Sequence, residues 1–337
     1  MARFFESFRF VFTIRHRKLL VAVALASFVV AARCAADDGV KRLRIAYPSN
    51  SLCCVPLFAA VQWKIFEDNG LSVEIVQIRS QLGNAALAGG EIQSFAGVGP
   101  ASISATLRGL PSRAVWFASD RLIYSLIARP GIRDLKDLRN KKIGLTGLGG
   151  TSHVAMQIAF EGAGENPKNF IYLSLAAAQI LPAIESGVID AGILSPPFIA
   201  YAQKKGLKEI FDVGSRVHMP FGGLTTMVSA LQSRPDEVKR VLRSLQLARR
   251  GILQSKEKSV AMIEKFLSVD RQAAEDTYGD LARTSSGNGV PTRDGIAQII
   301  QSLQMSGQFA DRKVAFEEVA DDRIAKEVAR ELGYKVE

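Results

Sequence analysis

The sequence contains few of the residues that carry metals, cofactors or covalent cross-links. Its 337 residues include three cysteines and three histidines. Three cysteines cannot build a disulfide scaffold in a chain of this length. No pair of cysteines or histidines has metal-ligand spacing, and the Gly-x-Ser-x-Gly segment of α/β-hydrolases is absent. The small number of cysteines excludes a domain held together by disulfides, and the missing motifs give little support for catalysis. We therefore expect no cofactor and no metal.

The composition also lacks the signs of a disordered or fibrous chain. Hydrophobic residues make up 47% of the sequence, and it holds only 28 glycines and 12 prolines. Such a chain can bury a sizeable core, and collagen-like or linker-like compositions are excluded. At roughly 150 residues per domain, the length predicts about two domains.

The sequence has no long apolar run, and the uncharged apolar segment near its N-terminus is short. Residues 1–18 are strongly basic, and residues 19–32 are fourteen residues without a charge. The small residues 34–36 follow. This order is typical of a secretory signal peptide, so we expect cleavage near Ala36 and export to the periplasm. The alternative is a membrane anchor formed by residues 19–32, although a membrane-spanning helix needs about 20 residues. Lipid attachment at Cys34 is disfavoured, because Arg33 stands where a small residue is required.

The net charge of +10 comes from 43 basic and 33 acidic residues and at first suggests nucleic acid or an anionic membrane. Residues 1–36 hold six of the basic residues and one acidic residue, so their removal leaves 37 against 32, a net charge of +5. The remaining basic residues are scattered and are not interleaved with aromatic residues. The pattern therefore argues against nucleic-acid binding.

Strand and helix patterns alternate along the mature chain, which predicts an α/β fold with largely parallel sheets. After about residue 235 the pattern is mostly helical. The predicted strands are 42–47, 71–78, 95–98, 113–118, 122–128, 142–146, 169–173, 189–194, 207–213 and 224–230. The predicted helices are 57–69, 84–89, 101–108, 134–138, 152–162, 176–186, 235–254, 256–267, 271–284, 292–305 and 321–332.

The alternation restarts near residue 134, which indicates two α/β units. The helical tail is too polar on one face to stand alone, so we expect it to pack back on the first unit. A chain that leaves one unit, builds the second and returns must cross twice. We place the crossings near residues 119–124 and 222–226.

Four segments carry a family resemblance: FAAVQWKIFEDNGLSVEIVQI, ALAGGEIQSFAGVGPASISATLRGL, GIRDLKDLRNKKIGLTGLGGTSHVAM and AIESGVIDAGILSPPFIAYAQKKGLKEI. In this order they resemble the solute-binding proteins of nitrate, sulfonate and taurine ABC importers, a branch that includes proteins for thiamine-pyrimidine precursors. The resemblance covers about residues 42–335. The resemblance identifies the family specifically but says little about which ligand is bound.

The resemblance implies the two-lobe type II periplasmic-binding-protein fold, with a small molecule held between the lobes. Together with the N-terminal pattern and the two crossings, it gives the expected division: residues 1–36 as signal peptide, 37–122 as the first part of lobe 1, 123–224 as lobe 2, and 225–337 as the rest of lobe 1. The expected partners are the ligand, an ABC permease and its ATPase, with no nucleic acid, and the protein is expected to be a monomer.

Five loops at strand ends are the candidate ligand contacts, since ligands of open parallel sheets lie at the carboxyl ends of the strands. Helix capping or plain turns explain several of these residues as well, and the glycines at 222–223 suit either a hinge or a ligand contact. The candidate residues are Ser49, Asn50, Ser51, Cys53, Cys54, Gly97, Gly99, Gly150, Thr151, Ser152, His153, Ser195, Pro196, Gly222 and Gly223.

The loop at residues 147–153 follows a predicted strand and opens a helix, so backbone N–H groups converge there. A dinucleotide fingerprint requires a third glycine where Ser152 stands, and an acidic residue about 20 positions later. Both are missing, and no lysine follows the glycines as in a P-loop. An anion or a polar small molecule at residues 150–152 remains the preferred interpretation, while His153 is either a donor or a packed histidine.

The ligand itself is not readable from the sequence, and sulfonates, nitrate-like anions, aromatic carboxylates and pyrimidine precursors all stay open. None of the five loops contains an arginine, which weakens the case for a strongly anionic ligand. Arg121, near a crossing, is the nearest cation, although an exposed surface position explains it too. Two alternatives to transport remain: an enzyme on this fold that acts on a pyrimidine precursor, and a membrane-tethered sensory module.

Overall fold

A computed structural model describes residues 42–119 and 121–336 of the chain, except for the side chain of Gln81. The predicted signal peptide and the alternative anchor lie outside these residues. Within the described part, no helix combines the length and the apolar composition needed to cross a membrane.

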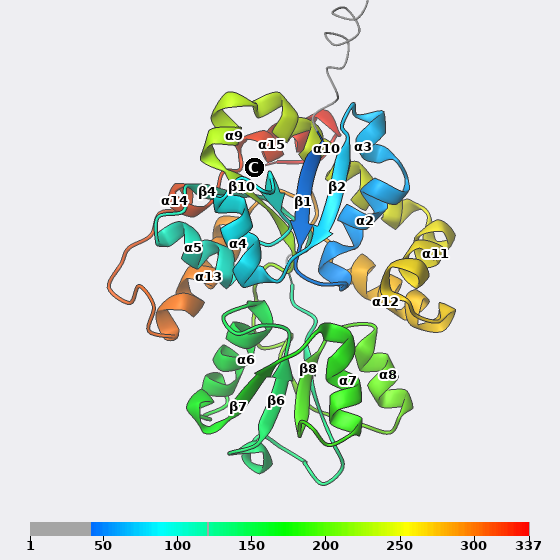
Figure 1. Cartoon of the computed structure of the whole chain (residues 1–337), viewed down its shortest axis with the longest axis vertical. Helices are drawn as coiled ribbons and strands as arrows, with labels where there is room; N and C mark the ends of the chain where they lie inside the picture. The colour runs from blue at the N-terminus through cyan, green and yellow to red at the C-terminus, as the bar shows by residue number, and fades with distance from the viewer. Residues whose placement is uncertain (1–41, 120, 337) are drawn as a thin grey trace, which may run out of the picture. The chain divides into compact units, whose positions relative to one another are not determined.

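The first sheet has the strand order β2-β1-β3-β10-β4 (Figure 1). β1 pairs in parallel with β2 and β3, whereas β10 runs antiparallel to both β3 and β4. β1 forms because Leu43 and Ile45, two residues apart, point to the same face of the strand and are buried in the core. The strands are β1 (Leu43–Tyr47), β2 (Val73–Gln77), β3 (Ser94–Phe95), β4 (Ser112–Phe117) and β10 (Gly223–Met227).

The second sheet has the order β7-β6-β8-β5-β9. β6 pairs in parallel with β7 and β8, and β5 runs antiparallel to β8 and β9. The central strand β8 is buried along its whole length, as expected for a strand covered on both faces. The strands are β5 (Ser125–Ala128), β6 (Lys142–Leu145), β7 (Ile171–Ser174), β8 (Ala191–Leu194) and β9 (Lys208–Asp212).

Each sheet is thus mixed in the same way: four strands share one direction and one strand, β10 or β5, opposes them. The predicted α/β class with mostly parallel sheets is confirmed. The reversed strands are those that follow the connections between the two sheets, and they begin at the end where the other strands finish.

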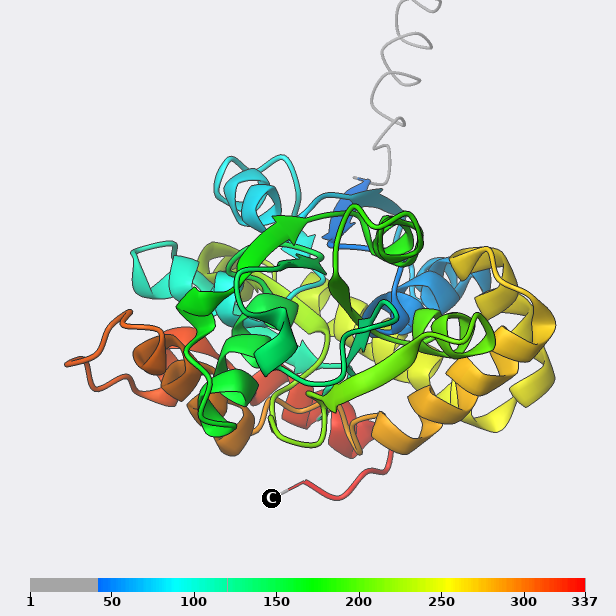
Figure 2. The same ribbon diagram turned by 90° about the horizontal axis from the view of Figure 1, so that it is seen from below.

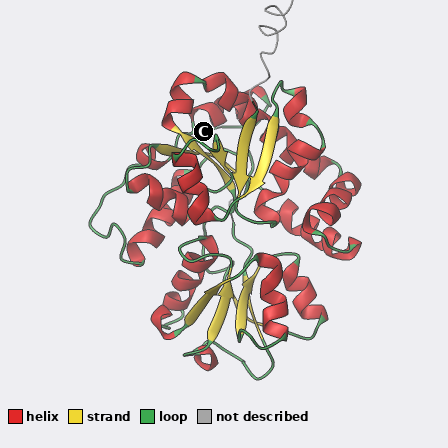
Figure 3. Ribbon diagram, viewed as in Figure 1, coloured by secondary structure: helices red, strands yellow, loops and turns green. Residues whose placement is uncertain are grey.

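Helices flank both sheets (Figure 3). The buried side chains of Phe66, Phe95 and Phe160 are among the largest in the core that these helices cover. The helices between strands are η1 (Leu52–Cys54), α2 (Val55–Gln62), α3 (Ile65–Asp68), α4 (Ser80–Ala88), α5 (Pro100–Leu107), η2 (Lys136–Leu138), α6 (Thr151–Gly162), η3 (Pro167–Asn169), α7 (Ala177–Glu185) and α8 (Phe198–Lys204).

The C-terminal helices pack mainly against the elements of the first sheet, as predicted. α10 contacts α2 and α3, and α14 contacts β4. α13 contacts α5 but also α6, and α12 contacts α8, so part of the tail reaches elements of the second sheet (Figure 2). These helices are α9 (Val228–Ser233), α10 (Pro235–Gln254), α11 (Lys256–Leu267), α12 (Arg271–Thr284), α13 (Arg293–Met305), α14 (Phe316–Val319) and α15 (Arg323–Glu331).

The predicted and the observed elements differ at several points. The single helix predicted over 57–69 is two helices, because Lys64 adopts a left-handed conformation with φ 60° and breaks the first one. The strand predicted over 224–230 ends at Met227, and α9 follows at once. The short helices α8 and α14 were not predicted: α8 begins right after two prolines, a pattern that in isolation is typical of a loop.

Candidate ligand-binding site

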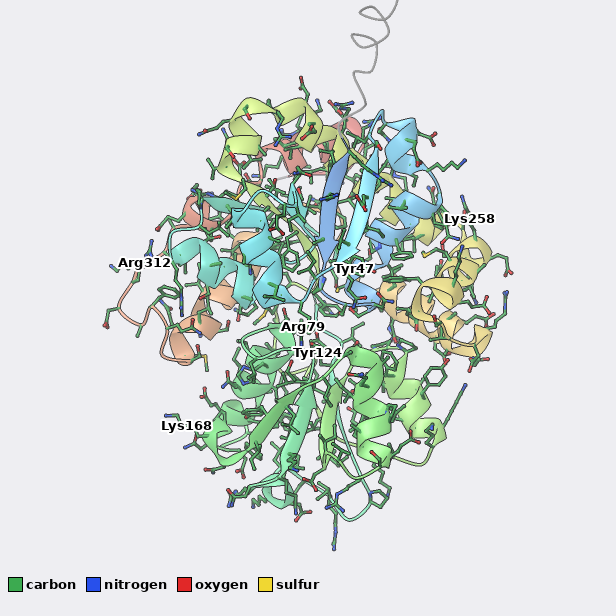
Figure 4. All side chains as sticks on the ribbon, in the orientation of Figure 1. Tyr47, Arg79, Tyr124, Lys168, Lys258 and Arg312 are labelled. Atoms are coloured by element: carbon green, nitrogen blue, oxygen red, sulfur yellow. The ribbon has the colours of Figure 1, made fainter. Side chains whose placement is uncertain are left out.

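The carboxyl ends of β1, β2, β3 and β6 lead into loops that line one cavity. The starts of β5 and β10 meet the same cavity, because these two strands run against the others. Figure 4 labels Arg79 and Tyr124, which both line the cavity, at this level between the two sheets. The cavity is therefore lined by connections of both sheets, as expected at the strand ends of an α/β fold.

Small, hydroxyl-bearing and glycine residues dominate the lining, with a few aromatic side chains among them. The lining residues are Pro48, Ser49, Ser51, Cys53, Arg79, Ser80, Phe95, Ala96, Gly97, Val98, Gly99, Ala101, Ser102, Tyr124, Thr146, Gly147, Gly150, Thr151, Ser152, Phe221 and Gly222.

The loop after β1 contributes a chain of polar side chains. The Oγ atoms of Ser49 and Ser51 lie 3.1 Å apart, and Ser51 Oγ lies 3.1 Å from the Sγ of Cys53. Cys53 Sγ in turn lies 3.2 Å from the Sγ of Cys54. The Cys54 thiol and the Ser51 hydroxyl hydrogen-bond Cys53 and hold its pKa below the ordinary value, although burial acts in the opposite direction.

Two helix N-termini face the cavity. Gly99 is the N-cap of α5 and Gly150 is the N-cap of α6, and neither has a side chain that could satisfy the first backbone N–H groups. A Cβ atom on Gly99 would lie 2.2 Å from Oγ1 of Thr151, so the two helix starts approach closely. In α5, Pro100 has no N–H and the Ser102 N–H donates to the Gly99 carbonyl, so this helix contributes mainly the positive end of its dipole. The first N–H groups of α6 have no partner within their helix. Together the two helix starts make this part of the cavity favourable for an anion.

Arg79 is the one charged residue among the described residues that line the cavity. It is the N-cap of α4, directly before Ser80, and its side chain is exposed. No ion pair of Arg79 with another described residue is present. Its guanidinium therefore adds a positive charge to the same cavity that α5 and α6 face. Arg121, the cation indicated by the sequence, is exposed and is not among the lining residues.

Aromatic side chains form the apolar part of the wall. Tyr124 and Phe221 meet edge to face, with ring centroids 5.2 Å apart. Burial raises the pKa of Tyr124, with a smaller contribution from Cys53 and Cys54, so the phenol stays neutral. Phe95 also lines the cavity and is 1% exposed. These rings suit the apolar part of an organic ligand.

Gly222 shows why the return crossing requires glycine. Its φ is 79°, and a Cβ atom there would lie 2.6 Å from the carbonyl oxygen of Cys53. Both the left-handed conformation and the close approach exclude a side chain. The glycine thus lets the start of β10 pass next to the loop after β1 and complete the wall.

The structure brings nine of the fifteen candidate residues together around this cavity. The residues that line it are Ser49, Ser51, Cys53, Gly97, Gly99, Gly150, Thr151, Ser152 and Gly222. The candidates that do not line it are Asn50, Cys54, His153, Ser195, Pro196 and Gly223.

The positions of these other residues have clear local reasons. His153 accepts a hydrogen bond from the Gly149 N–H at its Nδ1 and packs edge-on against Tyr172, 4.9 Å between centroids. Burial lowers the pKa of His153, which favours a neutral, packed ring. Cys54 is 1% exposed behind Cys53, and Ser195 is 7% exposed at the end of β8. Asn50 is exposed at the surface.

The candidate residues chosen from the sequence do not include Arg79, Tyr124 or Phe221, although Phe221 begins the fifth candidate loop. Arg79 follows a predicted strand and precedes a helix, which is the position that singled out the other loops. The predicted helix begins at residue 84, whereas α4 begins at Ser80, so the sequence pattern does not mark Arg79 as a helix start. Tyr124 and Phe221 lie on the two connections between the sheets, where only the fold shows which side chains face the cavity.

Metal-ligating side chains do not gather at the described positions: no group of three or more His, Cys, Asp or Glu residues is close enough there to hold an ion.

Solved structures show what this fold is similar to. A protein of Bordetella bronchiseptica RB50 superposes with a TM-score of 0.76 at 20% identity, covering 86% of this chain and 98% of the other. The alkanesulfonate-binding protein SsuA from Xanthomonas axonopodis pv. citri, solved with MOPS bound, gives 0.67 at 18% identity and covers 85% and 97%. The desulfurization enzyme DszB gives 0.62 at 16% identity and covers 86% and 100%.

At these identities the likeness shows the fold, which binding proteins and an enzyme share. Among curated proteins, none matches the sequence significantly. The family model described as NMT1/THI5-like, however, matches residues 54–258, more than half of the chain and most of the cavity loops. The chain therefore belongs to the NMT1/THI5-like family.

Proposed function

We propose that this protein is the solute-binding component of an ABC importer and that it captures a small organic anion in the cavity between its two sheets. The observation that carries the proposal is the combination of Arg79 with the N-termini of α5 and α6 in one wall. A guanidinium and free N–H groups stabilise negative charge, and the hydroxyls of Ser51 and Thr151 supply further hydrogen bonds.

The rest of the lining supports an organic rather than a purely inorganic anion. Phe95, Tyr124 and Phe221 provide apolar surface beside the polar wall. A sulfonate or carboxylate with a short apolar group uses both parts, whereas a nitrate-like ion uses only the polar part. SsuA, which has the same fold, is described as an alkanesulfonate-binding protein, and this agrees with the proposed class of ligand.

In the proposed division, lobe 1 holds residues 37–122 and 225–337, and lobe 2 holds residues 123–224. The lobes follow the two sheets except at residues 223 and 224, which begin β10 of the first sheet. The two connections lie side by side, since the Ala118 N–H donates to the Gly222 carbonyl over 3.1 Å and the Phe221 N–H donates to the Ser119 carbonyl over 3.0 Å. We take this paired segment as the hinge. A ligand that touches both lobes then stabilises the closed state by its differential affinity for it.

The remaining parts of the proposal follow from transport. The protein works in the periplasm after cleavage near Ala36, acts as a monomer, and presents its closed form to a permease with an associated ATPase. It binds without chemical change, so it is not an enzyme. The neighbours solved as import or sulfonate-binding proteins support this view, whereas DszB shows that the fold also carries catalysis.

A binding screen with matched variants tests the proposal. Thermal shift against alkanesulfonates, taurine, nitrate, aromatic carboxylates and pyrimidine precursors identifies ligands, because native-state binding raises stability. Calorimetry then compares Thr151→Ala, in the wall, with Ser195→Ala, which is also in the second sheet but does not line the cavity. We expect weaker binding for Thr151→Ala alone. Equal affinities would show that the site is misplaced, and product detected by NMR would favour an enzyme.

A further inference from the structure

Two adjacent thiols lie at the cavity, and one of them forms part of its wall. Cys53 lines the cavity, and Cys54 lies buried directly behind it, with the two Sγ atoms 3.2 Å apart. Binding of an organic anion at Arg79, α5 and α6 does not require a pair of thiols. The pair therefore offers a chemistry that the proposed transport function does not use.

A disulfide between these residues is disfavoured by covalent geometry. The Cα atoms of neighbouring residues are about 3.8 Å apart across a trans peptide bond. Disulfides usually join Cα atoms separated by about 4.4–6.8 Å, and shorter separations strain the bond. The pair is thus more stable as a dithiol, with both sulfur atoms available to a third atom.

The separation of the sulfur atoms indicates which atom can bridge them. Zinc with tetrahedral angles and bonds of about 2.3 Å needs sulfur atoms roughly 3.8 Å apart. Bond angles near a right angle at about the same bond length bring the sulfur atoms to about 3.3 Å. Trivalent arsenic is strongly thiophilic, three-coordinate and pyramidal, with angles near a right angle. The 3.2 Å separation of the two sulfur atoms is close to this value, so a pyramidal arsenic atom can bridge them with little movement of either side chain.

We propose that Cys53 and Cys54 form a chelating site for trivalent organoarsenicals at the wall of the ligand cavity. An arsenoxide R–As=O forms one As–S bond to each sulfur. The two thiol protons pass to the arsenic-bound oxygen, which leaves as water. The oxidation state of arsenic does not change, so the step needs neither an oxidant nor a reductant.

The surroundings favour this order of bond formation. Cys53 is the accessible sulfur, and its lowered pKa, set by hydrogen bonds from Cys54 and Ser51, increases its thiolate fraction. Cys54 then closes the chelate from 3.2 Å away. The group R on arsenic points into the cavity that Cys53 lines, so the adduct and the anionic ligand exclude each other.

Phenylarsine oxide tests the site directly. The full chain with Cys34→Ser keeps only Cys53 and Cys54, and it is reduced with a phosphine that is then removed. Intact mass measured in excess 2-mercaptoethanol, which strips adducts of single thiols, is expected to show one phenylarsenic group per chain. Cys53→Ser and Cys54→Ala, each checked for folding by circular dichroism, are expected to weaken retention by about 100-fold, because each loses the chelate effect.

Two results would overturn the proposal. Retention by Cys54→Ala equal to that of the two-thiol protein would show that Cys53 reacts alone. Failure of the folded, reduced two-thiol protein to retain the reagent would show that the pair does not chelate. A dithiol such as 2,3-dimercaptopropanol is expected to remove the adduct and restore binding of the anionic ligand found by the thermal-shift screen.

Discussion

Replacing Arg79 with glutamine removes the charge from the cavity while keeping a polar side chain of similar length. Arg79 is the lining cation and is exposed, so solvent screens it in part. Two unit charges about 5 Å apart interact by roughly 3 kcal/mol at an effective dielectric constant of 20 and by about 1 kcal/mol in water. For an exposed arginine we take a value between these two energies. The variant is therefore expected to lose about 1–2 kcal/mol of binding free energy, which raises Kd by about 5- to 30-fold.

Titration calorimetry with the best anion from the screen measures this loss, and Arg121→Gln is the matched control. Arg121 is another exposed arginine near the crossings, but it does not line the cavity. Raising salt from about 0.1 M to 1 M shortens the Debye length from about 10 Å to 3 Å, so the gap between wild type and Arg79→Gln should narrow. Equal Kd values for wild type and Arg79→Gln, with a loss at Arg121→Gln, would refute the assignment.

The other predictions concern the cavity wall, its pH response and the second sheet. Gly99→Ala places a Cβ atom 2.2 Å from Thr151 Oγ1, so the Thr151 side chain must rotate away. Calorimetry should therefore show weaker ligand binding. A Kd equal to that of the wild type would contradict the close approach of the two helix starts. As pH rises from neutral, ionisation of Cys53 adds negative charge to the wall, so anion affinity should fall, and it should fall less in Cys53→Ser. Burial alone would raise the pKa of Asp190, but the Lys142 N–H and Arg129 lower it overall. Because the folded pKa lies below the unfolded value of about 3.9, this carboxylate stabilises the fold above that pH, and the stabilisation is lost as pH falls through the folded pKa. Asp190→Asn should therefore lower the free energy of unfolding, measured in urea, by about 1 kcal/mol at neutral pH and by almost nothing in acid. An equal loss at both pH values would refute the ionic contribution.

Much of the fold follows from local patterns. The strands at β1, β6 and β8 and the helices at α6 and α10 lie within a few residues of their predicted bounds. Buried apolar residues recur at the helical period in α6 and α10, and the three strands are short, mostly buried runs. The break at Lys64 was not predicted, since a left-handed lysine leaves no trace in hydrophobic spacing. The turn from β10 into α9 depends on the hydrogen bond from the Val228 N–H to the Pro111 carbonyl, a contact between distant segments.

The site shows the same division between local and tertiary information. Gly99, Gly150 and Thr151 could be chosen because they lie between a strand and a helix, where N–H groups are exposed. His153 lies in the same loop, but its ring turns toward Tyr172, and only the packing of α6 on β7 decides that. Arg79 required the correct start of α4, and Phe221 required the pairing of the two crossings.

The central claim is that one cavity, walled by Arg79 and the starts of α5 and α6, captures a small organic anion. The most direct measurement is the thermal shift of the wild type and the Arg79→Gln, Thr151→Ala double variant across the anion panel. We predict that at least one sulfonate or carboxylate raises the Tm of the wild type and leaves that of the double variant unchanged. An equal rise in both proteins, or no rise with any anion in the wild type, would contradict the account.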